Sequence, residues 1–151
     1  TAMVFYQGKV LGTYHKQNLF GKEHGDITAG NQSLVFEAKG VKFSVLICAD
    51  VFLDSIFEEL KALKTQLVMI PTFSPYKEET IQDKIARDYE IFVKRANFLS
   101  CPVVKVCGIN TKGLLYPIQG RSLIALPKRI LWRASFNLEE REILKVSNLV
   151  L

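Results

Sequence analysis

Apolar and polar positions along the start of the chain predict two β-hairpins. In residues 2–16, aliphatic and aromatic residues flank a short polar break that contains a glycine, and the same arrangement recurs in residues 33–48. Extended apolar runs around such a break favour two antiparallel strands joined by a tight turn. The last strand of the second hairpin would then end at Cys48.

The hydrophobic period changes after the second hairpin. Apolar residues recur at helical spacing from residue 52 to about residue 65, which predicts an amphipathic helix. Thr80 with Asp83 has the form of a capping box and predicts the start of a second, longer helix that ends before Pro102. The stripes expected to face the core are Phe52, Ile56, Leu60 and Leu63 in the first helix, and Ile81, Ile85, Tyr89, Phe92, Ala96 and Leu99 in the second.

The remaining apolar runs are short and predict further strands. One, at residues 66–71, lies between the two helices and is closed by Pro71. The others follow the second helix at residues 103–109, 122–127, 130–135 and 141–151, with an irregular stretch at 110–120. Strands that alternate with helices favour an α/β layered sheet over a helical bundle or a β-sandwich.

Length and composition are those of one globular domain, residues 1–151. The chain has 48% hydrophobic and 23% charged residues. Its apolar runs are shorter than the roughly 18 to 20 residues that span a bilayer, and its first ten residues lack the order of a signal peptide. We therefore expect a cytoplasmic protein without a membrane partner.

The formal charge of +5 raises the question of an anionic partner. The basic residues are scattered, and the densest groups, at 14–22 and 126–133, alternate with apolar residues typical of strands. A solvated basic face is therefore favoured over a nucleic-acid site. The three cysteines lack the spacing of a zinc site and are odd in number, so neither a metal, a disulfide framework nor another cofactor is expected.

Cys48 holds the most informative position among the cysteines, between a predicted strand and a predicted helix. Ligands of open α/β sheets bind at the carboxyl ends of the strands, and backbone N–H groups at a strand-to-helix junction can hold an anion. A thiol in such a place can be a nucleophile, because the thiolate is the reactive form. A small buried hydrophobe is the other interpretation, and position alone leaves both open.

Five segments in register resemble the carbon–nitrogen hydrolase (nitrilase) superfamily. They are residues 13–20 (TYHKQNLF), 45–50 (VLICAD), 67–74 (LVMIPTFS), 92–98 (FVKRANF) and 118–127 (IQGRSLIALP). In that family the first segment supplies a lysine and the second a cysteine nucleophile. The resemblance implies hydrolysis of non-peptide carbon–nitrogen bonds in a small amide, carbamoyl compound or nitrile, through a cysteine thioester.

The resemblance assigns roles to individual residues. Cys48 would attack the substrate carbon, while Lys16 and the backbone N–H of Ala49 would stabilise the charge on the attacked atom. Asp50 is expected to cap the helix, and Arg95 to support the site through ion pairs.

Other assignments by resemblance concern the surroundings of the site. Glu23 lies where many members place a second glutamate beside the lysine, and a site role and an exposed loop charge both stay open. Thr72 and Phe73 belong to a predicted substrate loop. Cys101 and Cys107 match no catalytic position and are expected to be structural.

The family's general base is a glutamate from a strand–helix unit that precedes the lysine segment. The chain starts just upstream of that segment, so the resemblance implies an N-terminally truncated domain, a partial four-layer α-β-β-α sandwich. Exposed apolar surface in such a partial sandwich predicts a homo-oligomer. The alternative function is a catalytically impaired homologue that acts as an assembly or binding subunit.

Overall fold

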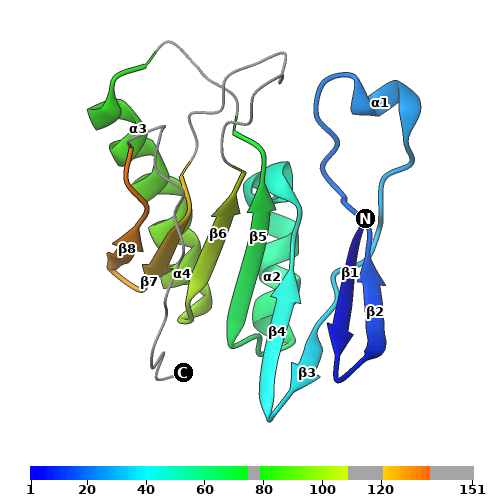
Figure 1. Ribbon diagram of the computed structural model, residues 1–151. Coiled ribbons are helices and arrows are strands. Elements are labelled where there is room, and N and C mark those ends of the chain that lie inside the picture. Colours follow the sequence, from blue (N-terminus) through cyan, green and yellow to red (C-terminus); the bar gives the residue numbers. More distant parts are fainter. Residues whose placement is uncertain (75–78, 109–120, 137–151) are drawn as a thin grey trace.

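The computed structural model describes residues 1–74, 79–108 and 121–136 (Figure 1). It begins with an antiparallel hairpin of β1 (Ala2–Tyr6) and β2 (Lys9–Tyr14), which confirms the first predicted hairpin. Gln7 and Gly8 form the turn, both with positive φ, as a tight hairpin turn requires. The hairpin lies close to the next strand, because a Cβ added at Gly12 would lie 2.8 Å from Cε1 of Phe36.

The remaining described strands form a six-stranded mixed sheet in the order β3-β4-β5-β6-β7-β8. The central strands β4, β5 and β6 are parallel, whereas β3, β7 and β8 pair antiparallel to their neighbours. The predicted strand at 141–151 and the irregular stretch at 110–120 lie outside the described residues. The bounds are β3 (Phe36–Ala38), β4 (Val41–Val45), β5 (Leu67–Thr72), β6 (Val103–Cys107), β7 (Leu123–Leu126) and β8 (Arg129–Arg133).

Helices cover one face of this sheet (Figure 1). The α/β class that the sequence predicts is confirmed, with a helix layer on a sheet layer. Among the described residues, none of the helices combines the length and the apolar character needed to cross a bilayer. The bounds are α1 (Glu23–Asp26), the 3-10 turn η1 (Cys48–Phe52), α2 (Asp54–Ala62), α3 (Ile81–Asp88), the π-helical turn η2 (Tyr89–Val93) and α4 (Lys94–Leu99).

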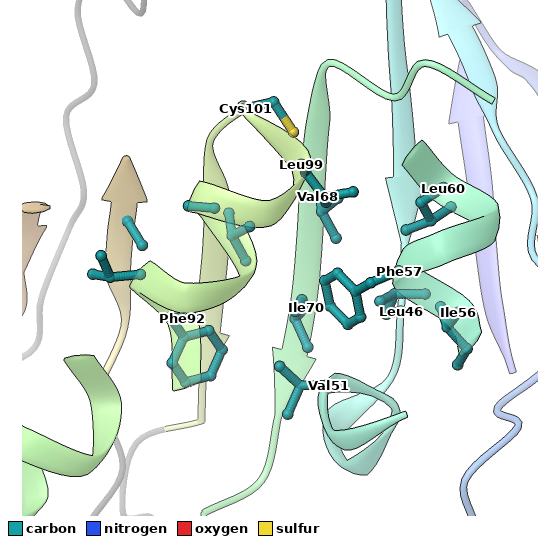
Figure 2. Close-up of a cluster of buried hydrophobic side chains, with 14 of the residues drawn as sticks. Leu46, Val51, Ile56, Phe57, Leu60, Val68, Ile70, Phe92, Leu99 and Cys101 are labelled. Atoms are coloured by element: carbon teal, nitrogen blue, oxygen red, sulfur yellow. The ribbon is translucent and has the colours of Figure 1, made fainter. Parts of the chain in front are cut away.

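The core lies between the sheet and the helices. Figure 2 shows Phe57 and Leu60 of α2 beside Leu46, Val68 and Ile70 from the parallel strands and their ends, and all five are fully buried. Burial of a large apolar side chain is worth about 1.5–3 kcal/mol. This packing fixes where β4 and β5 end relative to the helices.

The apolar stripe predicted for the first helix is wrong at both ends. Phe52 and Leu63 are 61% and 46% exposed, whereas Ile56 and Leu60 are buried as predicted, together with Phe57. At the first end the cause is η1, because Phe52 belongs to this tighter turn and the helix begins only at Asp54, whereas Leu63 follows the last helical residue, Ala62. A 3-10 turn has fewer residues per turn, so the spacing read across the junction does not describe one helical face.

The second helix is also interrupted, and half of its predicted stripe is wrong. Its capping box at Thr80 and Asp83 is confirmed, but Ile81, Ile85 and Tyr89 are exposed. The π-helical turn η2 inserts a residue and so rotates one half of the helix by about 100° against the other. Only the downstream half of the stripe, at Phe92, Ala96 and Leu99, therefore faces the core.

The upstream half of this helix buries charged side chains. Lys84 and Asp88 of α3 form an ion pair, and Nζ of Lys105 on β6 lies 3.1 Å from the same Asp88 oxygen, Oδ1. All three side chains are at most 2% exposed. Burial, and next the neighbouring Lys105, lower the pKa of Lys84 to about 8. The cluster thus places two ammonium groups on one carboxylate inside the fold.

Several apolar side chains remain on the surface. They include Met3, Phe5 and Val10 of the hairpin together with Ile81 and Ile85 of α3. Exposed apolar patches mark interaction surfaces in many proteins. The homo-oligomeric state stays a prediction.

Candidate active site

Cys48 lies just beyond β4, at the carboxyl edge of the parallel strands. Strand β4 ends at Val45, three residues earlier than the sequence predicts. The φ angle of Cys48 is 49°, in the left-handed region that a non-glycine residue rarely occupies. Such strain at a strand-to-helix turn is typical of exposed nucleophiles. The half-buried thiol donates a hydrogen bond to the Phe73 carbonyl at 3.5 Å.

Lys16 follows β2 and is nearly buried, at 8% exposure. Its Nζ lies 2.5 Å from Oε2 of Glu23 in α1. Its carbonyl accepts a hydrogen bond from the Gly30 N–H at 2.7 Å. A Cβ at Gly30 would lie only 2.3 Å from the His15 carbonyl oxygen, so the absence of a side chain there allows the two segments to touch.

Glu23 contacts the lysine directly. Its Oε2 also accepts the Phe20 N–H at 2.7 Å. The hydrogen bond from Lys16, and next that from Phe20, hold the pKa of Glu23 below its ordinary value. The carboxylate is therefore ionised at neutral pH and bound to the lysine.

Asp50 joins two segments that are distant in the sequence, which we name the lysine loop (residues 14–18) and the cysteine turn (residues 47–50). The carboxylate is fully buried. Its Oδ1 accepts the N–H groups of Gln17 at 3.0 Å and Asn18 at 2.7 Å. Its Oδ2 accepts the Tyr14 hydroxyl and the Ile47 N–H, both at 2.8 Å. The bond from the Ile47 N–H caps the turn, and the other three bonds come from the lysine loop.

A further bond connects the same two segments. Nδ2 of Asn18 donates to the Ala49 carbonyl at 2.7 Å. Burial, and next the Asp50 carboxylate, raise the pKa of the Tyr14 hydroxyl, which therefore remains a proton donor. Sequence reasoning missed the roles of Tyr14 and Asn18, although both lie within the segment that supplies the lysine.

Arg95 holds the cysteine turn from the helix side. Its Nε donates to the Val51 carbonyl at 2.9 Å, and its Nη1 lies 2.6 Å from Oδ1 of Asp54. The guanidinium group also stacks over the Phe57 ring, 4.3 Å from its centroid. Arg95 therefore connects α4 with η1 and with the start of α2.

The predicted substrate-loop residues stand at the same sheet edge. Thr72 ends β5 and donates its hydroxyl proton to the Ile70 carbonyl at 3.1 Å. Phe73 has an exposed ring, and its carbonyl accepts the Cys48 thiol. Strand β5 thus continues past Pro71, where the sequence predicts its end. Residues 75–78 of this loop lie outside the described residues.

The other two cysteines differ from Cys48 in their surroundings. Burial raises the pKa of the Cys101 thiol to about 11. Burial is also the main cause of the raised pKa of Cys107. Thiolate is the reactive form of cysteine, so both residues are poorly suited to nucleophilic attack near neutral pH.

We expect iodoacetamide to alkylate Cys48 before Cys101 and Cys107 in the folded chain at pH 7.5. The physical reason is that burial disfavours the thiolate at the other two positions. The measurement is peptide mapping of a labelling time course. Faster labelling of Cys101 or Cys107 would contradict the assignment of the nucleophile.

Comparison with known proteins identifies one similar sequence and several solved structures with a similar fold. No family model matches the chain. The chain is 36% identical over 89 residues to the glutamine-dependent NAD(+) synthetase of Acinetobacter baylyi, an alignment that covers 56% of the chain and 16% of that protein.

Solved structures share the fold over most of the chain. The glutamine-dependent NAD+ synthetase of Acinetobacter baumannii, in complex with ADP, matches with a TM-score of 0.74 and 28% identity over 87% of the chain and 25% of its own length. The Nesterenkonia AN1 amidase, from the nitrilase superfamily, matches with a TM-score of 0.73 and 22% identity over 86% of the chain and 48% of its own length. Another structure of this amidase shows acrylamide added to its active-site cysteine.

The chain therefore spans half or less of the length of these relatives. The sequence match and one of the fold matches are both to glutamine-dependent NAD synthetases, and the other fold match is to an amidase. The motifs around Lys16 and Cys48 meet in the folded structure, because the lysine loop is bonded to the cysteine turn. The chain thus shares its fold with the Nesterenkonia AN1 amidase, a member of the nitrilase superfamily, and part of its sequence is similar to a glutamine-dependent NAD(+) synthetase.

Proposed function

We propose that the chain hydrolyses non-peptide carbon–nitrogen bonds through a thioester on Cys48. The observation that supports this best is the bonding of the lysine loop to the cysteine turn, with Cys48 in a left-handed turn at the carboxyl edge of the sheet. An interaction module would need neither the strained thiol nor the lysine held beside its carboxylate partner.

In the proposed acylation, the Cys48 thiolate attacks the carbonyl carbon of an amide. The carbonyl π electrons move to oxygen, and Lys16 together with the Ala49 N–H stabilises the oxyanion that forms. Collapse of this intermediate breaks the carbon–nitrogen bond, and the nitrogen takes up a proton as it leaves. Water then adds to the thioester, which releases the acid and restores the thiol.

Proton transfer is the demanding part of this sequence. A positioned base with a pKa near 6 to 7 contributes about 10² to 10⁴ in rate. Glu23 does not suit that task, because Lys16 and Phe20 hold its pKa below the ordinary value. We infer that Glu23 orients Lys16 and that this chain by itself opens its thioester slowly.

The test is the reaction of the purified chain with p-nitrophenyl acetate. We expect one acetyl group to attach to Cys48, to be visible by intact mass and peptide mapping, and to persist. A Cys48→Ala variant should not form the adduct, whereas the matched control Cys107→Ala should form it at the rate of the unmodified chain. Absence of acylation at Cys48 would contradict the proposed function, whereas rapid multiple turnover of simple amides would contradict only the inferred slow opening of the thioester.

Glutamine is the first amide to test as the natural substrate. The support is that both NAD synthetases among the relatives are named as glutamine-dependent. A panel of glutamine, an aliphatic amide, a carbamoyl amino acid and a nitrile would show which substrate acylates Cys48 fastest. The cytoplasmic location stays a prediction.

The second candidate function is an impaired homologue that acts as an assembly or binding subunit. The low pKa of Glu23 and the exposed apolar side chains of the hairpin favour it. The two candidates differ in one measurable property, because only the first requires Cys48 to be acylated.

A further inference from the structure

We propose that Tyr14 is a positioning residue for the acylation step, acting through Asp50 on Lys16. This role rests on the proposed function. Tyr14 closes β2, and its hydroxyl bonds to the carboxylate two residues after Cys48. Lys16 lies between this bond and the bonds that Gln17 and Asn18 make to the same carboxylate.

The hydrogen bonds of Asp50 are fully used. Each carboxylate oxygen accepts two donors, and the four donors come from the lysine loop and the cysteine turn. Hydrogen bonds to a buried carboxylate are stronger than those between neutral groups. The carboxylate thus fixes the orientation of the lysine loop at both ends of Lys16.

The Tyr14 hydroxyl can be removed without disturbing the core. The side chain is fully buried in the hydrophobic cluster, so Tyr14→Phe keeps the ring and its packing. The lysine loop then keeps its bonds through Gln17 and Asn18 but loses the one that precedes Lys16. A shift of about 1 Å in a group that stabilises a transition state can lower the rate about 10²-fold.

The experiment measures the rate of acylation of Cys48 in the full chain over a range of p-nitrophenyl acetate concentrations. These rates give a maximal rate and a half-saturating concentration. We expect Tyr14→Phe to lower the maximal rate about 10- to 100-fold while the half-saturating concentration stays nearly unchanged. The matched control is Ser44→Ala, which removes another buried hydroxyl, 3.4 Å from Oγ1 of Thr65. Ser44→Ala should leave the rate of acylation unchanged, even if urea unfolding shows that it loses as much stability as Tyr14→Phe.

A double-mutant cycle separates positioning from general loosening of the fold. If Tyr14 acts through Lys16, the pair Tyr14→Phe and Lys16→Met should acylate no more slowly than Lys16→Met alone. Additive losses in the double variant would overturn the role. Asn18→Ala, which removes the bond to the Ala49 carbonyl, is a second variant for which the same non-additivity is expected.

The outcomes also distinguish this role from the proposed function. If the unmodified chain acylates and Tyr14→Phe acylates at the same rate, the positioning role is wrong and the proposed function stands. If the unmodified chain never acylates, the proposed function is wrong, and the positioning role is overturned with it.

Discussion

Replacing Asp88 with asparagine is expected to lower the free energy of unfolding by about 3 to 5 kcal/mol. Asp88 is the carboxylate that both Lys84 and Lys105 contact, and the three side chains are at most 2% exposed. Asparagine keeps the size of the side chain but removes its charge, which leaves two buried ammonium groups without a counter-charge. The measurement is urea unfolding, compared with the unmodified chain.

The matched control is Asp54→Asn. Asp54 also forms an ion pair, with Arg95, but its side chain is 83% exposed. Exposed pairs contribute about 0 to 1 kcal/mol, so this variant should unfold nearly as the unmodified chain does. If Asp88→Asn lost no more stability than Asp54→Asn, the buried cluster would not hold the helix to the sheet.

A companion variant, Lys84→Met, keeps the test decisive where Asp88→Asn does not fold. It removes one of the two ammonium groups and leaves Lys105 paired with Asp88, so we expect unchanged or increased stability at pH 7. The pKa of Lys84 is about 8 when folded, below its ordinary 10.5, so the unfolded chain binds more protons between these values. Stability of the unmodified chain should therefore rise as pH increases through that window, whereas Lys84→Met should lack this rise.

Replacing Lys16 with methionine is expected to slow acylation of Cys48 by about 10² to 10³, the usual effect of removing an oxyanion donor. Methionine retains the length of the buried side chain but has no charge to stabilise the intermediate. The remaining Glu23 carboxylate keeps its Phe20 bond and is partly exposed, so the fold should be little affected. The measurement is the rate of adduct formation with p-nitrophenyl acetate, alongside urea unfolding.

The control for this prediction is Lys61→Met on α2. Lys61 contacts the Phe98 ring, with its Nζ 4.4 Å from the centroid, so the variant removes one positive charge elsewhere on the molecule. If Lys16→Met acylated Cys48 as fast as Lys61→Met, Lys16 would not be an oxyanion donor. A loss of stability in Lys16→Met without a loss of rate would lead to the same conclusion.

Much of the fold could be predicted from local signals. Turn glycines between apolar runs predicted both hairpins, and the capping box at Thr80 predicted the start of α3. The position of Cys48 at the carboxyl end of a strand followed from the same reasoning, although β4 ends at Val45, three residues before the predicted end. Lys16 and Glu23 are also close in the sequence, and the structure brings them into contact.

Other features depend on contacts between distant residues. The phase of the second helix changes at η2, and the resulting rotation buries Lys84 and Asp88 against Lys105 of β6, which no hydrophobic period reveals. A charged residue is buried only where a partner from elsewhere in the fold offsets its desolvation.

In the candidate site, too, some features follow from local sequence and others depend on contacts between distant residues. Sequence alone determined the candidate residues for the chemistry, Cys48 and Lys16, because their segments have recognisable local patterns. Only the tertiary structure decided how the two segments are joined, since Tyr14 and Asp50 lie 36 positions apart and meet through one buried hydrogen bond. Their bond forms only when the hairpin packs against the sheet, and packing of this kind is not encoded in any local run of residues.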